Sequence, residues 1–227
     1  METITGSVEP AGPWRGFDSR AIDIAFVGRL TECKRPDRFV AAIAEVAKAL
    51  PCVRAVMIGD GPDAALLKAR AHQLGIASNL RLLGKRSDVD RLLAQSRVFL
   101  LTSRWEGLSI AMLEAMAAGA VPVVADVGDL ADLVENGSTG FIVAPDDIAG
   151  YARACVQALS SEPRWTALSG QATRSALARS GIDAIARRWG LHLHAVIVIT
   201  RQARGWRMLK LIRAMTGPGR AARRPMH

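Results

Sequence analysis

Short apolar runs alternate with longer amphipathic stretches along most of this chain. Six of the runs are almost continuously apolar, and each predicts a strand, at residues 22–27, 54–58, 79–83, 98–101, 121–125 and 140–143. Strands that are covered on both faces have this composition, whereas half-exposed strands alternate apolar and polar positions. The pattern therefore predicts a parallel sheet with helices on both faces.

Helical periodicity fills the segments between the runs. A helix is predicted from Pro36, because proline suits the first helical turn. Its apolar positions recur every three or four residues and share one face: Phe39, Ile43, Val46 and Leu50. Further helices are predicted at about 62–74 and 109–118, and the chain is purely helical after Pro145.

The alternation of strand and helix defines the fold class that we expect. Strand–helix units that repeat in this way predict an α/β fold with a single Rossmann-like, doubly wound parallel sheet of about six strands, plus C-terminal helices. The expected domain spans residues 21–195. Residues 1–20 are rich in Pro, Gly, Ser and charge, lack the apolar core of a signal peptide and predict a leader or linker.

The charge of the chain is unevenly distributed. The formal net charge is +9, yet residues 184–227 hold ten of the 30 Lys and Arg residues and no Asp or Glu. The other 183 residues carry 20 basic and 21 acidic groups, so the sequence predicts a neutral body with a basic extension at residues 196–227. Three widely spaced cysteines fit neither a disulfide framework nor a metal site and favour a reducing, cytoplasmic location.

Residues 201–215 have the pattern of an amphipathic helix. Four cations gather on one side of a helical wheel: Arg204, Arg207, Lys210 and Arg213. This pattern favours residues 201–224 as a contact with an anionic membrane on its inner face. Two alternatives stay open, since the apolar face can pack in a core and the end of the chain can be a solvated tail. Nucleic acid is not favoured as a partner, because no base-stacking aromatic pattern accompanies the charges.

Candidate binding residues follow the predicted strands, where ligands bind in doubly wound folds. Gly28, Arg29 and Lys34 follow the first strand, and Gly84 and Lys85 follow the third. The two cations Arg29 and Lys34 suit a bound phosphate, although they can also be ordinary surface cations. Neither a P-loop nor a GxGxxG motif is present, so ATPase and nicotinamide-dependent functions lack their signatures.

The segment RWEGLSIAMLEAMAAG carries two carboxylates in an otherwise apolar helix. Glu106 precedes the predicted helix and Glu114 lies within it, as a buried or cleft-lining group. Both can accept hydrogen bonds from sugar hydroxyls, or Glu114 can form a structural salt bridge with Arg104. The amides of Gly107, Leu108, Ser109 and Ile110 open the helix and attract an anion. A nucleotide sugar combines these features.

These motifs together resemble a known enzyme family. The stretches VGRLTECKRP, IGDGP, LLGKRSDV, TSRWEGLSIAMLEAMAAGAVPVVADVGD and LVENGSTGFIV follow one another in that family's order between about residues 26 and 145. They resemble retaining glycosyltransferases built from two Rossmann domains, and most closely the large family 4 of nucleotide-sugar-dependent enzymes. Glu106 and Glu114 match the Glu-x7-Glu signature of that family.

The resemblance implies a role for each matched residue. Arg29 and Lys34 would bind the diphosphate of the donor and stabilise charge on the leaving group, and Glu106 would contact the transferred sugar. These three are the expected catalytic residues. Glu114 would hold the ribose.

The backbone positions have implied roles as well. Gly28 would give the donor backbone room, the amides of residues 107–110 would face sugar and phosphate, and the turn at Gly84 and Lys85 would contact the base. No metal or cofactor is expected besides the donor substrate.

The resemblance also implies the C-terminal, donor-binding domain of a two-domain enzyme. Only about 20 residues precede the first predicted strand, so we expect a separate acceptor-domain protein as partner. Two positions depart from the family pattern, Ser109 and Asp129, the latter in place of a glycine. Two alternatives stay open: a non-catalytic nucleotide-sugar-binding or scaffolding module, and a nucleotide-sugar epimerase.

Overall fold

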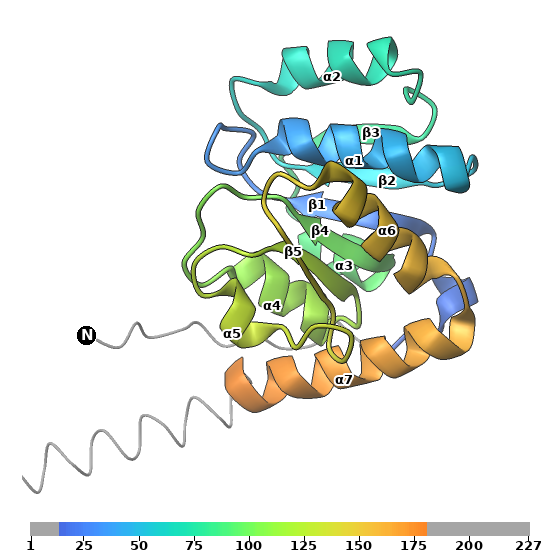
Figure 1. Ribbon diagram of the computed structural model, residues 1–227, viewed down its shortest axis with the longest axis vertical. Coiled ribbons are helices and arrows are strands. Elements are labelled where there is room, and N and C mark those ends of the chain that lie inside the picture. The colour runs from blue at the N-terminus through green and yellow to red at the C-terminus, as the bar shows by residue number, and fades with distance from the viewer. Residues whose placement is uncertain (1–13, 181–227) are drawn as a thin grey trace, which may run out of the picture. The chain divides into compact units, whose positions relative to one another are not determined.

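The computed structural model describes residues 14–180 (Figure 1). Residues 1–13 and 181–227 lie outside the described residues. Most of the predicted leader and the whole predicted basic helix therefore fall outside them, and both stay predictions.

A parallel sheet of six strands forms the centre of the described part. The strand order is β3-β2-β1-β4-β5-β6, and all neighbouring strands run parallel. The strands are β1 (Ile22–Val27), β2 (Ala55–Ile58), β3 (Leu80–Gly84), β4 (Ser96–Leu101), β5 (Val121–Ala125) and β6 (Phe141–Val143). The predicted α/β class with a doubly wound parallel sheet is confirmed.

Helices cover both faces of this sheet, as predicted (Figure 1). Helices α1, α2 and α6 pack together on one face, and α3, α4 and α7 pack together on the other. The helices are α1 (Pro36–Ala49), α2 (Ala64–Gln73), α3 (Val89–Ala94), α4 (Ile110–Ala117), α5 (Leu130–Leu133), α6 (Ile148–Leu159) and α7 (Glu162–Ser180), with a 3₁₀ turn η1 (Phe17–Ser19). Because helices lie on both sides, the strands need apolar side chains on both faces, which explains the continuous apolar runs.

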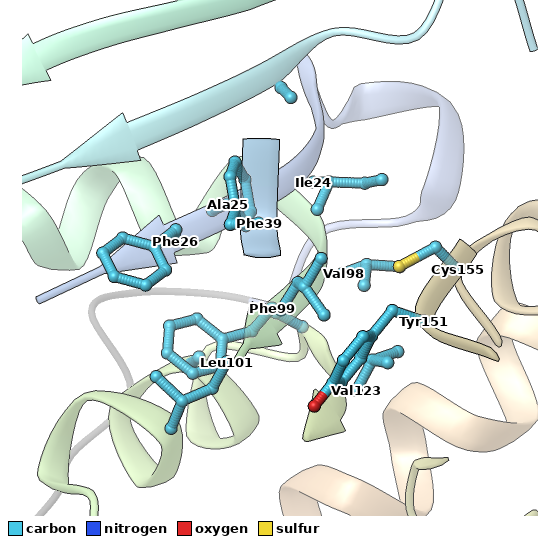
Figure 2. Packing of buried hydrophobic residues seen from close by; sticks show 14 of the residues in the cluster. Ile24, Ala25, Phe26, Phe39, Val98, Phe99, Leu101, Val123, Tyr151 and Cys155 are labelled. Carbon is cyan, nitrogen blue, oxygen red and sulfur yellow. The ribbon is translucent and has the colours of Figure 1, made fainter. Parts of the chain in front are cut away.

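The hydrophobic core extends over both faces of the sheet, and Figure 2 shows part of it. The predicted apolar face of α1 points into it: Phe39, Ile43 and Val46 are fully buried, while Leu50 is half-buried. The Phe39 ring lies 5.4 Å from the Phe26 ring of β1. Tyr151 and Cys155 of α6 pack beside α1 on the same face of the sheet (Figure 2). This packing fixes α1, and therefore the loop that precedes it.

The residues just before β1 pack against α7. The Trp14 ring stacks on Trp165 at 5.7 Å, and the Phe17 ring meets Trp165 edge-on at 5.5 Å. The Trp14 indole N–H also donates to the Ser169 hydroxyl at 3.2 Å. Trp14 and Phe17 therefore pack on α7, although the segment that holds them has the composition of a linker.

Arg20 is a buried cation that binds three carbonyl oxygens. Its guanidinium donates to the carbonyls of Arg15, Ser96 and Ala118 at 3.0, 2.6 and 2.8 Å. Burial, with repulsion from Arg15 and Arg97, lowers the pKa of Arg20 to about 10. Because Ala118 is the C-cap of α4, this cation also meets the negative end of that helix.

We expect Arg20→Lys to destabilise the fold by about 2 kcal/mol, because one ammonium group cannot reproduce the geometry of the planar fork. Urea unfolding followed by circular dichroism measures this change. Arg86→Lys is the matched control, because Arg86 makes an exposed ion pair with Asp88 at 2.8 Å that contributes little. Equal midpoints for the two variants would contradict the role given to Arg20.

Within residues 14–180, no helix has both the length and the apolar composition needed to cross a membrane.

Candidate functional site

The strand order creates a topological switch point at the carboxyl ends of β1 and β4, and we call the region between the loops that follow these strands the crevice. These strands are neighbours in the sheet but not in sequence, and the chain leaves β1 for α1 on one face and β4 for α4 on the other. The two loops therefore diverge, and this topological switch point is where doubly wound folds bind ligands. Residues 28–35 follow β1 and residues 102–109 follow β4.

Lys34 and Glu106 meet in this crevice. The Lys34 Nζ lies 2.5 Å from the Glu106 Oε2, and the Ser103 hydroxyl donates to the same oxygen at 2.9 Å. Glu106 is 8% exposed and Lys34 is half-buried, so this ion pair is held largely out of water. Two of the three predicted catalytic residues are therefore brought together from positions 72 residues apart.

Backbone contacts join the two loops around this pair. The Arg104 amide donates to the Cys33 carbonyl at 2.9 Å, and the Thr102 hydroxyl donates to the Arg35 carbonyl at 2.9 Å. Arg35 has a left-handed backbone conformation with a φ of 47°. It is the only non-glycine residue between 14 and 180 with a positive φ. The Thr102 contact holds that conformation, so the loop after β4 fixes the direction in which α1 leaves the crevice.

Two glycines allow neighbouring loops to approach the crevice. A Cβ atom on Gly128, in the loop after β5, would lie 1.7 Å from the Glu106 carbonyl oxygen. A Cβ atom on Gly59, in the loop after β2, would lie 1.8 Å from the Gly28 carbonyl oxygen. The loops after β1, β2, β4 and β5 therefore form one packed rim, and only glycine fits at these two contacts.

Arg29 is available to a ligand at this rim. Its side chain is exposed and forms no ion pair with any residue between 14 and 180. The preceding Gly28 is half-exposed and donates its amide to the Ile58 carbonyl at 3.0 Å. The backbone of the predicted anion-binding loop is therefore tied to β2, and, among the described residues, the loop carries one unpaired cation, Arg29, and one paired cation, Lys34.

The N-terminus of α4 faces the same rim. The Ser109 hydroxyl caps the helix by accepting from the Met112 amide at 3.3 Å, so the departure from the family pattern at Ser109 supplies a cap. No group among the described residues accepts a hydrogen bond from the backbone amides of residues 107–110. Ile110 is 51% exposed, and Gly107 and Leu108 are half-exposed. These amides are free to bind an anion.

Glu114 is exposed on the surface of α4. The sequence left open whether this carboxylate is buried or lines a cleft, and the structure shows that it is not buried. The proposed salt bridge with Arg104 is wrong, because Arg104 pairs with Glu32 at 2.8 Å. Partial desolvation, with a smaller contribution from Asp90, raises the pKa of Glu114 above its usual value. No Lys or Arg among the described residues forms an ion pair with Glu114. The carboxylate is therefore available to a ligand.

The predicted base-contacting turn lies at the end of β3. Gly84 has a positive φ of 67°, and its carbonyl accepts from the Gly59 amide at 2.9 Å, which connects this turn to the same rim. Lys85 is exposed. Asp129, beside Gly128, is also exposed and accepts no hydrogen bond from within residues 14–180. The rim therefore carries both signs of charge.

Two residues of this site were not predicted from the sequence. Ser103 binds Glu106 directly, and Gly128 packs on the Glu106 backbone. Ser103 has a weak signal in the sequence, since it is a short polar residue directly after a buried strand. The Gly128 contact joins two loops that follow different strands, so it depends on the strand order.

The strand order and the helices on both faces define a Rossmann-type, doubly wound domain. Arg29, the Lys34–Glu106 pair and the amides of residues 107–110 belong to the segments that follow β1 and β4 at the switch point. Among residues 14–180, no group of three or more His, Cys, Asp or Glu side chains is placed to hold a metal ion. A sequence model of the family described as "Glycosyl transferases group 1" matches residues 15–175. The chain belongs to this family, which confirms the resemblance seen in the sequence.

Individual relatives agree with this assignment. The chain is 33% identical over 162 residues to the lipopolysaccharide core biosynthesis mannosyltransferase LpsB of Rhizobium meliloti (strain 1021), which covers 68% of this chain and 46% of that protein. It is 32% identical over 172 residues to the D-inositol 3-phosphate glycosyltransferase of Mycobacterium sp. (strain JLS), with 72% and 38% covered. The chain thus spans less than half of these relatives.

Solved structures share the fold. HepE of Anabaena, determined in complex with UDP-glucose, matches with a TM-score of 0.70 at 24% identity, covering 77% of this chain and 49% of that one. The pneumococcal O-GlcNAc transferase GtfA, determined with UDP and GlcNAc, matches with a TM-score of 0.71 at 22% identity, covering 86% and 38%. At these identities the likeness establishes the fold.

Proposed function

We propose that this chain forms the donor-binding half of a retaining glycosyltransferase. It would bind a nucleoside-diphosphate sugar and take part in transfer of the sugar to a hydroxyl group of a glycan or lipid-linked saccharide. The observation that carries this proposal is the Lys34–Glu106 pair at the switch point, beside the open cation Arg29. Membership of the glycosyltransferase family supports the same activity.

In this proposal the crevice binds the donor by charge and hydrogen bonding. Arg29 and Lys34 neutralise the diphosphate together with the free amides of residues 107–110. Glu106 accepts hydrogen bonds from hydroxyls of the transferred sugar, and Glu114 accepts from the ribose. Gly84 and Lys85 lie beside the base. No metal is needed for neutralisation, since two cations and a helix N-terminus face the diphosphate.

The reaction would break the bond between the anomeric carbon and the diphosphate oxygen and form a bond from that carbon to the acceptor oxygen. Negative charge then develops on the leaving diphosphate. Lys34 and Arg29 stabilise that charge, which lowers the barrier because both side chains are already positioned. Glu106 holds the sugar in place and keeps Lys34 oriented through their ion pair.

The acceptor side requires a second domain, in the same or in another polypeptide. The residues described here place charged groups on one wall of the crevice, and an acceptor hydroxyl must approach from the opposite wall. Trp105 is 68% exposed beside Glu106 and would face that second wall. We propose that an acceptor-binding domain closes on this side.

Isothermal titration with UDP, GDP and ADP and their sugar conjugates tests donor binding. We expect saturable binding of one base series, weakened by Arg29→Ala and by Glu114→Ala. Lys68→Ala, which removes an exposed cation from α2, is the matched control and should bind as the unmodified chain does. A folded chain that binds none of these ligands would overturn the donor-site assignment.

As the pH is lowered, donor affinity should begin to decrease at a higher pH than it would if Glu114 had the usual glutamate pKa. The pKa of Glu114 is raised above its usual 4.5, mainly by desolvation, so protonation begins at a higher pH. The protonated acid has lost an acceptor for the ribose hydroxyls, and affinity therefore decreases as pH falls through this raised pKa. Titrations between about pH 4 and pH 8, a range that begins just below the usual pKa and extends well above it, measure the effect.

Asp90→Asn provides the control for this pH dependence. Removing the Asp90 charge should lower the pKa of Glu114 and move the loss of affinity to lower pH. Glu114→Gln should abolish this component of the pH dependence. An unchanged profile in Glu114→Gln would assign the effect to another group.

A further inference from the structure

A second pocket lies outside the donor crevice, between α1, α2 and the loop that joins β6 to α6. Its volume is about 440 Å³. The floor includes apolar side chains such as Ala41, Leu67 and Ile148, and the walls carry three arginines and two aspartates: Arg35, Arg38, Arg70, Asp37 and Asp146. We call this the α1–α2 groove. Its charged groups differ in how completely they are paired.

Arg38 is the least satisfied of these groups. Arg38 is only 7% exposed, and its Nη2 donates a hydrogen bond to the Asp146 carboxylate. Its Nη1 is buried and has no hydrogen-bond partner, a condition that no other side-chain nitrogen or oxygen among residues 14–180 shares. A buried charged donor without a partner is costly, so Arg38 is a candidate to bind a ligand or ion.

The other charges of the groove leave a positive excess. Arg35 and Asp37 neutralise each other through two hydrogen bonds of 2.9 and 2.7 Å. Arg70 is exposed and meets only the neutral Gln73 amide, at 3.5 Å, among the described residues. Asp146, the partner of Arg38, is 88% exposed and lies on a loop. Arg70 is therefore the unpaired cation among the described lining residues, and Arg38 lines the same groove with one donor unused.

We propose that the α1–α2 groove binds the phosphate group of a small organic phosphate. The oxygens of one phosphate can reach two guanidinium groups at once, which the planar arginine fork recognises well. The phosphate would complete the hydrogen bonding of Arg38, and the carbon skeleton would lie on the apolar floor. This site is separate from the donor crevice and does not depend on the proposed transferase activity.

The groove is connected to the donor crevice through one residue. Arg35 lines the groove, follows Lys34 directly and accepts a hydrogen bond from Thr102 through its carbonyl. The donor-binding loop, residues 28–35, ends where α1 begins. A ligand that fixes the positions of Arg38 and Asp146 would therefore also affect the end of that loop.

Nuclear magnetic resonance of the full chain with glycerol 3-phosphate as probe tests this proposal. At constant ionic strength, we expect saturable shifts at the amides of residues 66–73 and 146–148, and none with glycerol. Arg70→Ala should weaken this binding about tenfold, because a charge-assisted hydrogen bond is lost. Arg38→Gln should weaken glycerol 3-phosphate binding at least as much. If Arg38→Gln fails to fold, Arg70→Ala still tests the proposal, because Arg70 is exposed and its loss should not unfold the chain.

Two controls separate this site from the donor crevice and from general salt effects. Lys68→Ala removes a cation from the same helix α2 but lies on a different groove, with His72 and Leu80, and should leave binding unchanged. Arg29→Ala should remove binding at the donor crevice only. Shifts confined to the loops at Gly28, Gly84 and Gly107, shifts that do not saturate, or unchanged binding in Arg70→Ala would overturn the proposal.

Discussion

Lys34→Met is expected to lower the rate of sugar transfer about 10²–10³-fold, because a preorganised cation beside the leaving diphosphate is lost. With the acceptor-binding domain present, the release of nucleoside diphosphate from the donor that the titrations identify measures this rate. The same substitution should destabilise the fold by about 3 kcal/mol, since it leaves the Glu106 carboxylate buried with Ser103 as its remaining partner. Two effects thus arise from one residue and need to be separated.

A double-mutant cycle with Glu106→Gln separates them. The neutral amide removes the uncompensated charge, so Lys34→Met with Glu106→Gln should be more stable than Lys34→Met alone. Donor affinity and transfer should stay low in the double variant, because the cation is still absent. Recovery of donor binding in the double variant would show that Lys34 serves only to neutralise Glu106.

Much of the sheet could be predicted from sequence because its strands are buried on both faces. The strands at Ile22–Val27 and Val121–Ala125 coincide with their apolar runs, and β4 only gained Ser96 and Arg97 at its start. Helices α3 and α5 were missed, since each is short and buries a single residue, Leu93 or Leu130. Local periodicity is too weak over six or four residues to indicate a helix.

The segment before β1 was harder to predict for a different reason. Its composition is that of a linker, yet Trp14 contacts Ser169 across 155 positions of sequence and Arg20 contacts Ala118 across 98. Such contacts depend on where α7 and the end of α4 lie in the folded unit. Composition and periodicity describe a segment's own tendency, and here tertiary packing decides the outcome.

The candidate site could be predicted in its residues but not in its arrangement. The strand–loop pattern and the family resemblance pointed to Arg29, Lys34, Glu106 and Glu114. The direct pairing of Lys34 with Glu106 required the strand order, which brings β1 and β4 together. Glu114 is exposed because it lies on the outer surface of α4, which its apolar sequence neighbours did not indicate.

Gly128→Ala should lower sugar transfer about 10²-fold, because it displaces the loop that carries Glu106 and small misplacements of reacting groups are costly. The added Cβ would lie 1.7 Å from the Glu106 carbonyl oxygen and 2.8 Å from its carbon, so backbone must move. Glu106 holds Lys34, and a shift of this loop therefore disturbs two of the three expected catalytic residues. Donor turnover and urea unfolding should be measured on the same preparation.

Gly137→Ala distinguishes this displacement from simple backbone strain. Gly137 has a φ of 78° and Gly128 a φ of 55°, so alanine at either position costs about 1–2 kcal/mol in stability. A Cβ on Gly137 meets no atom within 4 Å, so it adds strain without a clash. We expect both variants to lose stability and only Gly128→Ala to lose transfer. Equal transfer in the two variants would mean that the loop after β5 does not position Glu106, and that Ser103 and Lys34 suffice to hold it.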